Sequence, residues 1–137
     1  MAASLSGAIK QTIEGAGLGL AAYRDDAGTN VTDARWVTIS EGIVITTRRL
    51  GDDGDDDPVT ELVQVDLWQP WRSGPDGGAA EDYTLADRLE VCLHGAPLAD
   101  APVHVRSCKV DDCRRFVEKD RNLVHHALTL RIERERS

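Results

Sequence analysis

The segment Glu61–Trp68 constrains the possible folds more than any other part of this chain. Its side chains form two alternating sets, one wholly apolar and one mixed: Val63, Val65 and Leu67 against Leu62, Gln64, Asp66 and Trp68. Successive side chains of a β-strand point to opposite faces of the sheet. The alternation therefore predicts a strand in a sheet that is covered on one face only, with Trp68 on the less covered face.

Further strands and two helices are predicted around this segment. β-branched residues favour strands over residues 36–40 and 43–47. A later strand is expected to begin at residues 103–106 and to bend near 111–112, and the last strand is expected over 124–133. Apolar residues at helical spacing predict helices over residues 5–15, after the capping residue Ser4, and from residue 85 to the stop at Gly95. Residues 17–33 show no sustained period.

These elements predict one α+β domain over residues 1–137, in the order α-βββ-α-ββ. We expect an antiparallel or mixed β-sheet of about five strands with both helices packed on one face. The length of 137 residues and the 41% hydrophobic and 29% charged fractions are those of an ordinary single globular domain.

The charge balance excludes several classes of function. With 16 Lys and Arg against 24 Asp and Glu, the net charge of −8 opposes a standing role in binding DNA or an anionic membrane. The chain has no apolar run long enough to span a bilayer, and it does not begin like a secretory signal. The odd number of cysteines, 3, suits free thiols in a reducing compartment. We expect a soluble protein that is made inside the cell.

The residue types for a zinc or catalytic site are present, but their spacing is wrong. Cys108 and His104 would stand about 13 Å apart along one strand, too far to share an ion, and Cys113 and His126 do not repair the pattern. His126 lies in the apolar phase of its strand, which predicts a hydrogen-bonded core or interface histidine rather than a base. His125 has the opposite phase and is expected to be exposed. We predict no cofactor, no metal and no enzyme.

An acidic cluster leaves three interpretations open. The pattern of an EF-hand fails, because its sixth and twelfth positions, counted from Asp53, hold Pro58 and Gln64. A loosely held divalent ion, a solvated loop and a contact with the basic patch of a partner all remain possible. The cluster consists of Asp52, Asp53, Asp55, Asp56 and Asp57.

Two tryptophans are the strongest candidates for contacts with other proteins. Trp68 lies on the less apolar face of its strand, and Trp71 follows in a Pro-containing loop. Tryptophan at a half-covered surface is a common anchor of protein–protein interfaces. For Trp71 a fold-back over the sheet edge is an equal alternative. The candidate interface residues are Trp68, Trp71, Leu62, Asp52, Asp53, Asp55, Asp56 and Asp57.

Three segments together resemble the tail terminator, or tail completion, proteins of long-tailed (siphovirus-type) phages. They are the strand that ends in a tryptophan, Glu61–Trp68, the helix Leu85–Gly95 and the late strand His125–Ile132. The similarity extends over residues 5–134, and the departures from the family are the five-Asp loop and residues 111–120.

The resemblance implies a ring, usually a hexamer, that caps the tail tube and stops its polymerisation. Its partners would be other copies of the chain, the major tail tube protein and the head–tail connector or stopper. DNA would pass through the lumen without specific binding, which suits an acidic wall. Such a protein is assembled in the host cytoplasm and resides in the tail or neck of the virion.

Three other functions compete with this expectation. The first is another neck or tail protein, such as a head-completion, stopper or minor tail protein. The second is a small intracellular enzyme that uses His126, Cys108 or the Asp loop. The third is an acidic module that captures a basic partner.

Overall fold

The computed structural model describes residues 4–24, 34–45, 58–72 and 80–136. The elements occur along the chain in one series: α1 (Leu5–Glu14), β1 (Ala21–Arg24), β2 (Trp36–Ile39), β3 (Ile43–Ile45), β4 (Val59–Pro70), α2 (Leu85–Leu93), β5 (Val105–Glu118), the 3₁₀ turn η2 (Lys119–Arg121) and β6 (Leu123–Arg134).

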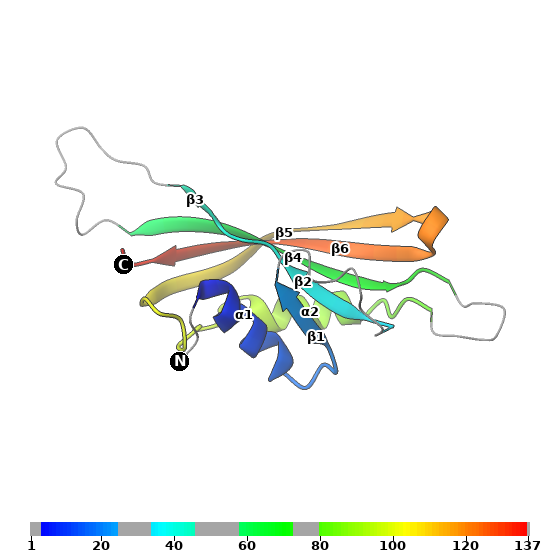
Figure 1. Ribbon diagram of the computed structural model, residues 1–137, viewed down its shortest axis with the longest axis horizontal. Coiled ribbons are helices and arrows are strands. Elements are labelled where there is room, and N and C mark those ends of the chain that lie inside the picture. Colours follow the sequence, from blue (N-terminus) through cyan, green and yellow to red (C-terminus); the bar gives the residue numbers. More distant parts are fainter. Residues whose placement is uncertain (1–3, 25–33, 46–57, 73–79, 137) are drawn as a thin grey trace.

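The strands form one mixed sheet in the order β1-β2-β4-β6-β5, and β3 pairs with β4 beyond the end of β2. Only β1 and β2 are parallel, and the other pairs are antiparallel. The long β5–β6 hairpin extends past the helices and carries η2 at its tip (Figure 1).

Both helices lie beneath the same face of the sheet (Figure 1). The α1 helix begins where the Ser4 hydroxyl accepts a hydrogen bond from the Gly7 amide at 3.0 Å, which satisfies one of the free amides of the first turn. Its buried side chains recur at helical spacing and are Leu5, Ala8, Ile9 and Ile13. The corresponding residues of α2 are Leu85, Ala86, Leu89 and Leu93.

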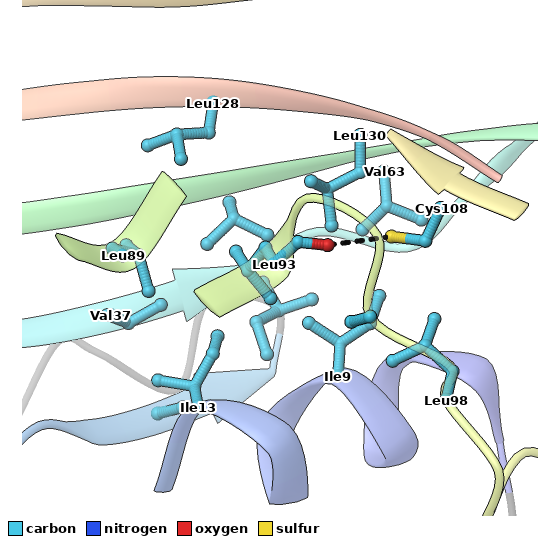
Figure 2. Packing of buried hydrophobic residues seen from close by; sticks show 14 of the residues in the cluster. Ile9, Ile13, Val37, Val63, Leu89, Leu93, Leu98, Cys108, Leu128 and Leu130 are labelled. Atoms are coloured by element: carbon cyan, nitrogen blue, oxygen red, sulfur yellow. Dashed lines mark hydrogen bonds between the residues drawn. The ribbon is translucent and has the colours of Figure 1, made fainter. Parts of the chain in front are cut away.

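The core fills the space between the helices and the sheet (Figure 2). Ile9, Ile13, Leu89 and Leu93 belong to the same buried cluster as the inward side chains of the strands, Leu128 among them. Burying one such aliphatic side chain contributes about 1.5–3 kcal/mol. The hydrophobic core of the domain therefore lies on one side of the sheet only, between the sheet and the two helices.

The prediction of an α+β fold with two helices on one face of a sheet is confirmed. One local prediction is wrong. Residues 21–24 form β1, although residues 17–33 showed no period, because a four-residue strand with one buried side chain, Ala22, leaves too short a pattern. The strand expected to begin at 103–106 and to bend near 111–112 runs from Val105 to Glu118, with register shifts between Val105 and Ser107 and between Val110 and Asp112.

A candidate interaction surface on the open sheet face

The sheet face opposite the helices carries a row of ring side chains across four strands. Trp36, Trp68, His125 and Phe116 are successive register partners on β2, β4, β6 and β5. Their ring centroids are 6.0, 4.4 and 5.0 Å apart in that order. These distances lie in the range in which aromatic rings attract each other beyond the burial of their area. We call these four residues the aromatic row.

Trp68 lies at the centre of the aromatic row and is half-buried. The planes of the Trp68 and Trp36 rings differ by 8°, so the two rings are stacked. The Trp68 Nε1–H donates a hydrogen bond to the Thr38 hydroxyl at 3.0 Å. The guanidinium of Arg121 lies 5.8 Å from the ring centroid. Trp68 is therefore on the face that the alternation predicted.

His125 differs from its expected exposure. The side chain points away from the core as predicted, but only 18% of it is exposed, because the rings of Trp68 and Phe116 lie on either side of it. Its Nδ1 has no hydrogen-bond partner among the described residues and lies 3.8 Å from a Glu118 oxygen. Phase along a strand predicts the direction of a side chain, and cross-strand neighbours decide its burial.

Trp71 follows the end of β4 and is half-buried. Its backbone amide donates to the Asn122 carbonyl at 3.0 Å, which ties this segment to the turn before β6. The guanidinium of Arg72 lies 4.0 Å from the centroid of the Trp71 ring, and the Lys119 amine lies 5.8 Å from it. The ring thus lies beside the hairpin tip with cations next to its π-face.

Leu62 lies on the same face as the aromatic row, near the other end of β4. Its register partner in β3 is Ile43, and the next residue on that side is Ile45. Ile43 is 68% exposed and Ile45 is 45% exposed, whereas Leu62 is half-buried. Leu62 therefore belongs to an apolar edge of the open face. Asp52, Asp53, Asp55, Asp56 and Asp57 lie outside the described residues.

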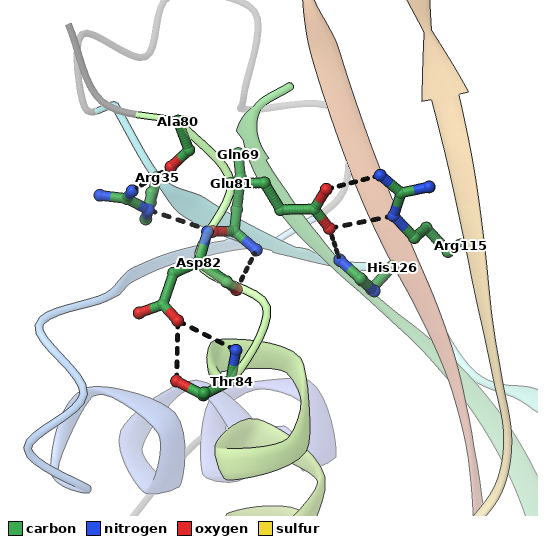
Figure 3. Close-up of polar contacts among 8 residues, drawn as sticks. All are labelled: Arg35, Gln69, Ala80, Glu81, Asp82, Thr84, Arg115 and His126. Atoms are coloured by element: carbon green, nitrogen blue, oxygen red, sulfur yellow. Dashed lines mark hydrogen bonds and ion pairs between the residues drawn. The ribbon is translucent and has the colours of Figure 1, made fainter. Parts of the chain in front are cut away.

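On the helix side, a buried carboxylate joins two strands (Figure 3). Glu81 accepts hydrogen bonds from Arg115 Nε at 3.0 Å and from Arg115 Nη2 at 2.6 Å. Its Oε2 also lies 2.9 Å from His126 Nε2. Only 1% of the Glu81 side chain is exposed. Hydrogen bonding from Arg115 is the main cause that lowers the pKa of Glu81 below its ordinary value, with a smaller contribution from His126 and partial opposition from burial.

A second polar group fixes the segment that leads into α2 (Figure 3). The side-chain oxygen Oε1 of the buried Gln69 accepts hydrogen bonds from Arg35 Nε at 3.1 Å and from the backbone amide of Asp82 at 2.9 Å. The Asp82 carboxylate in turn accepts from the amide and the hydroxyl of Thr84. Every partner of Gln69 is far from it in sequence, so strand and helix patterns carry no signal for this group.

His126 is the buried, hydrogen-bonded histidine that its phase predicted, but its partner Glu81 was not foreseen. A buried imidazole requires a hydrogen-bond partner, and this requirement was the available signal. Among the described residues, no group of three or more His, Cys, Asp or Glu side chains is placed to hold a metal ion. No described helix is long and apolar enough to cross a membrane.

The three cysteines lie apart and form no disulfide. Cys108 is buried, and its thiol donates a hydrogen bond to the Leu93 carbonyl at 3.4 Å (Figure 2). Burial raises the pKa of Cys108 to about 11. Such a thiol is a small core residue rather than a nucleophile, because the reactive thiolate is suppressed.

Comparison with solved structures identifies a protein of the same fold. A chain described as belonging to the virion of a native gene transfer agent (GTA) particle superposes with a TM-score of 0.70 and 12% sequence identity. The match covers 97% of this chain and 96% of that chain. At this identity the likeness establishes the fold. No protein-family model and no curated protein sequence matches the chain.

Proposed function

We propose that this chain is a structural protein of a virion and, more narrowly, the tail terminator of a long-tailed phage or a related particle. In this role several copies form a ring, hexameric as in the family it resembles. The ring caps the tail tube, stops its polymerisation and provides the surface that joins the tail to the head connector.

The observation that carries this proposal is the shared fold with a chain of an assembled virion over nearly the full length of both chains. The one-sided sheet supports it independently. The aromatic row leaves Phe116 46% exposed, on a face that no described element of the chain covers. Half-exposed aromatic rings are characteristic anchors of protein interfaces.

The electrostatics of the chain suit a conduit rather than a nucleic-acid reader. The net charge of −8 leaves no surplus of cations to hold phosphates, so DNA would pass through the lumen without specific binding. Contacts with the tube protein and the connector are assigned in this proposal to Trp68, Trp71 and Leu62, and to the acidic residues 52–57. No cofactor or catalytic step is part of the role.

A tube-growth assay tests the proposal. The major tail tube protein of the same virus is polymerised alone or with this chain, and tube lengths and tube ends are measured by electron microscopy. We expect shorter tubes with a ring at one end. Trp71→Ala should reduce capping, whereas Val91→Ala, which alters an exposed residue of α2, should not. Tubes that grow equally long with and without the chain would contradict the proposal.

A further inference from the structure

The sheet has two lateral edges, one formed by β1 and β3 and the other by β5. On each edge the described residues cover one part and leave another part free. At β1, the outward amide of Ala22 donates to the Glu14 carboxylate at 3.2 Å, so α1 covers this edge. At β5, the turn after α2 covers the middle of the strand, since Gly95 N–H donates to the Cys108 carbonyl and Val110 N–H donates to His94 Nδ1. Such capping prevents an edge strand from pairing with another chain.

The β3 edge has no comparable protection among the described residues. All three of its side chains are apolar and exposed: Ile43 by 68%, Val44 by 51% and Ile45 by 45%. Its pairing with β4 uses only one side of the strand. Exposed apolar side chains without a charge or a proline leave an edge strand able to pair with a further strand.

A second free edge lies at the far end of β5. From Asp111 to Glu118, no described residue outside the strands forms a backbone hydrogen bond with β5. This stretch includes Phe116, which is exposed on the same sheet face as Ile43 and Ile45. The stretch also carries charged residues, and these are paired within the same copy: Asp112 with Arg114 at 2.7 Å and Asp111 with Arg131 at 2.9 Å.

The directions of the two free edges match. Because β3–β4, β4–β6 and β6–β5 are all antiparallel, β3 and β5 run in opposite directions. When two copies lie side by side in the same orientation, β3 of one copy therefore meets β5 of the next as an antiparallel pair. A contact between two different edges is heterologous, and repeated copies close into a ring when the rotation from one copy to the next completes a full turn.

We propose that the subunits of the ring are joined by strand pairing between β3 of one copy and the Asp111–Glu118 part of β5 of the next copy. This inference rests on the proposed ring and specifies its subunit contact. Ile43 and Ile45 then pack against Phe116 of the neighbour, which removes apolar surface on both edges from water.

The pairing also implies a tilt of the strands. Through the pairing of β3, β4, β6 and β5, Ile43 lies level with Lys109 of the same copy. To pair Ile43 with Phe116 of the next copy, the two copies must be displaced along the strand direction by six register positions. Six residues at about 3.3 Å give roughly 20 Å, and four strands at about 4.8 Å give roughly 19 Å of width. The strands would then lie at about 45° to the ring axis, close to the tilt of closed barrels.

Cysteine cross-linking tests the contact on rings formed by the full chain. Ile43→Cys and Phe116→Cys are introduced together in a Cys113→Ser background, because Cys113 is exposed. We expect mild oxidation to produce a ladder of covalent oligomers on a denaturing gel. Each single variant should give no ladder. Covalent dimers from Ile43→Cys alone would indicate pairing between two copies of β3 and would overturn the inference.

A charge test provides a second measurement. Ile43→Lys with Ile45→Lys should raise the concentration needed for assembly by about tenfold or more, since lysines on an edge strand oppose pairing. The melting temperature of the monomer should hardly change, and Val91→Lys on α2 is the matched control. If the native chain forms rings that this variant also forms, the strand contact is wrong. If the native chain never forms rings, the proposed function itself fails.

Discussion

The Glu81 carboxylate and the His126 imidazole lie 2.9 Å apart, and more than nine-tenths of each side chain is buried. Arg115 completes the group by holding the same carboxylate through two of its nitrogens. The three residues connect the segment before α2 to β6 and β5. This connection fixes the position of the helix layer relative to the long hairpin.

Glu81→Gln is expected to destabilise the fold by about 1–3 kcal/mol, because the buried group loses a charge-assisted acceptor. Urea unfolding at neutral pH measures this change. Asp112→Asn is the control, since both side chains of its ion pair with Arg114 are exposed and the pair contributes about 0–1 kcal/mol. Equal losses in the two variants would contradict the structural role of Glu81.

The contribution of Glu81 should depend on pH with a definite sign. Because Arg115 and then His126 lower the pKa of Glu81 in the folded protein, the folded state binds this proton more weakly than the unfolded chain does. The stabilisation is therefore complete above the ordinary value of 4.5 and is lost as the pH falls through the folded pKa. The difference in unfolding free energy between the native chain and Glu81→Gln should shrink below pH 4.5. A difference that grows on acidification would be inconsistent with this sign.

Gly42 lies against the side chain of Glu61, which leaves little room for a larger residue. A Cβ atom at position 42 would lie 1.9 Å from Glu61 Oε2, and Glu61 forms a largely buried ion pair with Arg134 at 3.0 Å. Gly42→Ala should displace the carboxylate and cost about 1–3 kcal/mol. In a Glu61→Ala background the same change should be nearly neutral, because the clash is gone. Additive effects of the two substitutions would show that the clash is not the cause.

The thiols should react in the order of their exposure. Cys108 has a pKa of about 11 and is 1% exposed, so it should react with DTNB only when the protein unfolds. Cys113 is exposed, although burial and then the nearby Glu90, Asp112 and Asp87 raise its pKa, which should slow the reaction relative to free cysteine. Cys113→Ser should remove the fastest native phase. Persistence of that phase would mean that another thiol is accessible.

Trp68 should contribute to stability as well as to assembly. Trp68→Phe keeps an aromatic ring but removes the hydrogen bond to Thr38, so we expect a loss of about 0.5–1.5 kcal/mol. Trp68→Ala should cost more, because the stacking on Trp36 and the ring contact with His125 are also lost. Chemical unfolding of the two variants measures both losses. If neither variant changes the unfolding free energy, Trp68 acts in assembly alone.

The sequence predicted the features that follow the alternation of side chains along a strand, namely which residues face the core and which face away from it. The alternation over 61–68 correctly placed Val63 in the core and Trp68 on the open face, and the same pattern placed His126 inward. The buried partner of His126 could not be predicted, because Glu81 lies 45 residues away in an irregular segment. The aromatic row was missed for a similar reason. Trp36, Trp68, His125 and Phe116 become neighbours only when the register of four strands is known.

The mass of the native particle tests the central claim most directly. Native mass spectrometry or light scattering of the purified chain, alone and with the tail tube protein, should detect a closed ring. Six copies of 14.9 kDa give about 89 kDa. A particle of this mass, or of another fixed small multiple, is the result that the account predicts. A monomer of 14.9 kDa at every concentration, in both the presence and the absence of the tube protein, would contradict it.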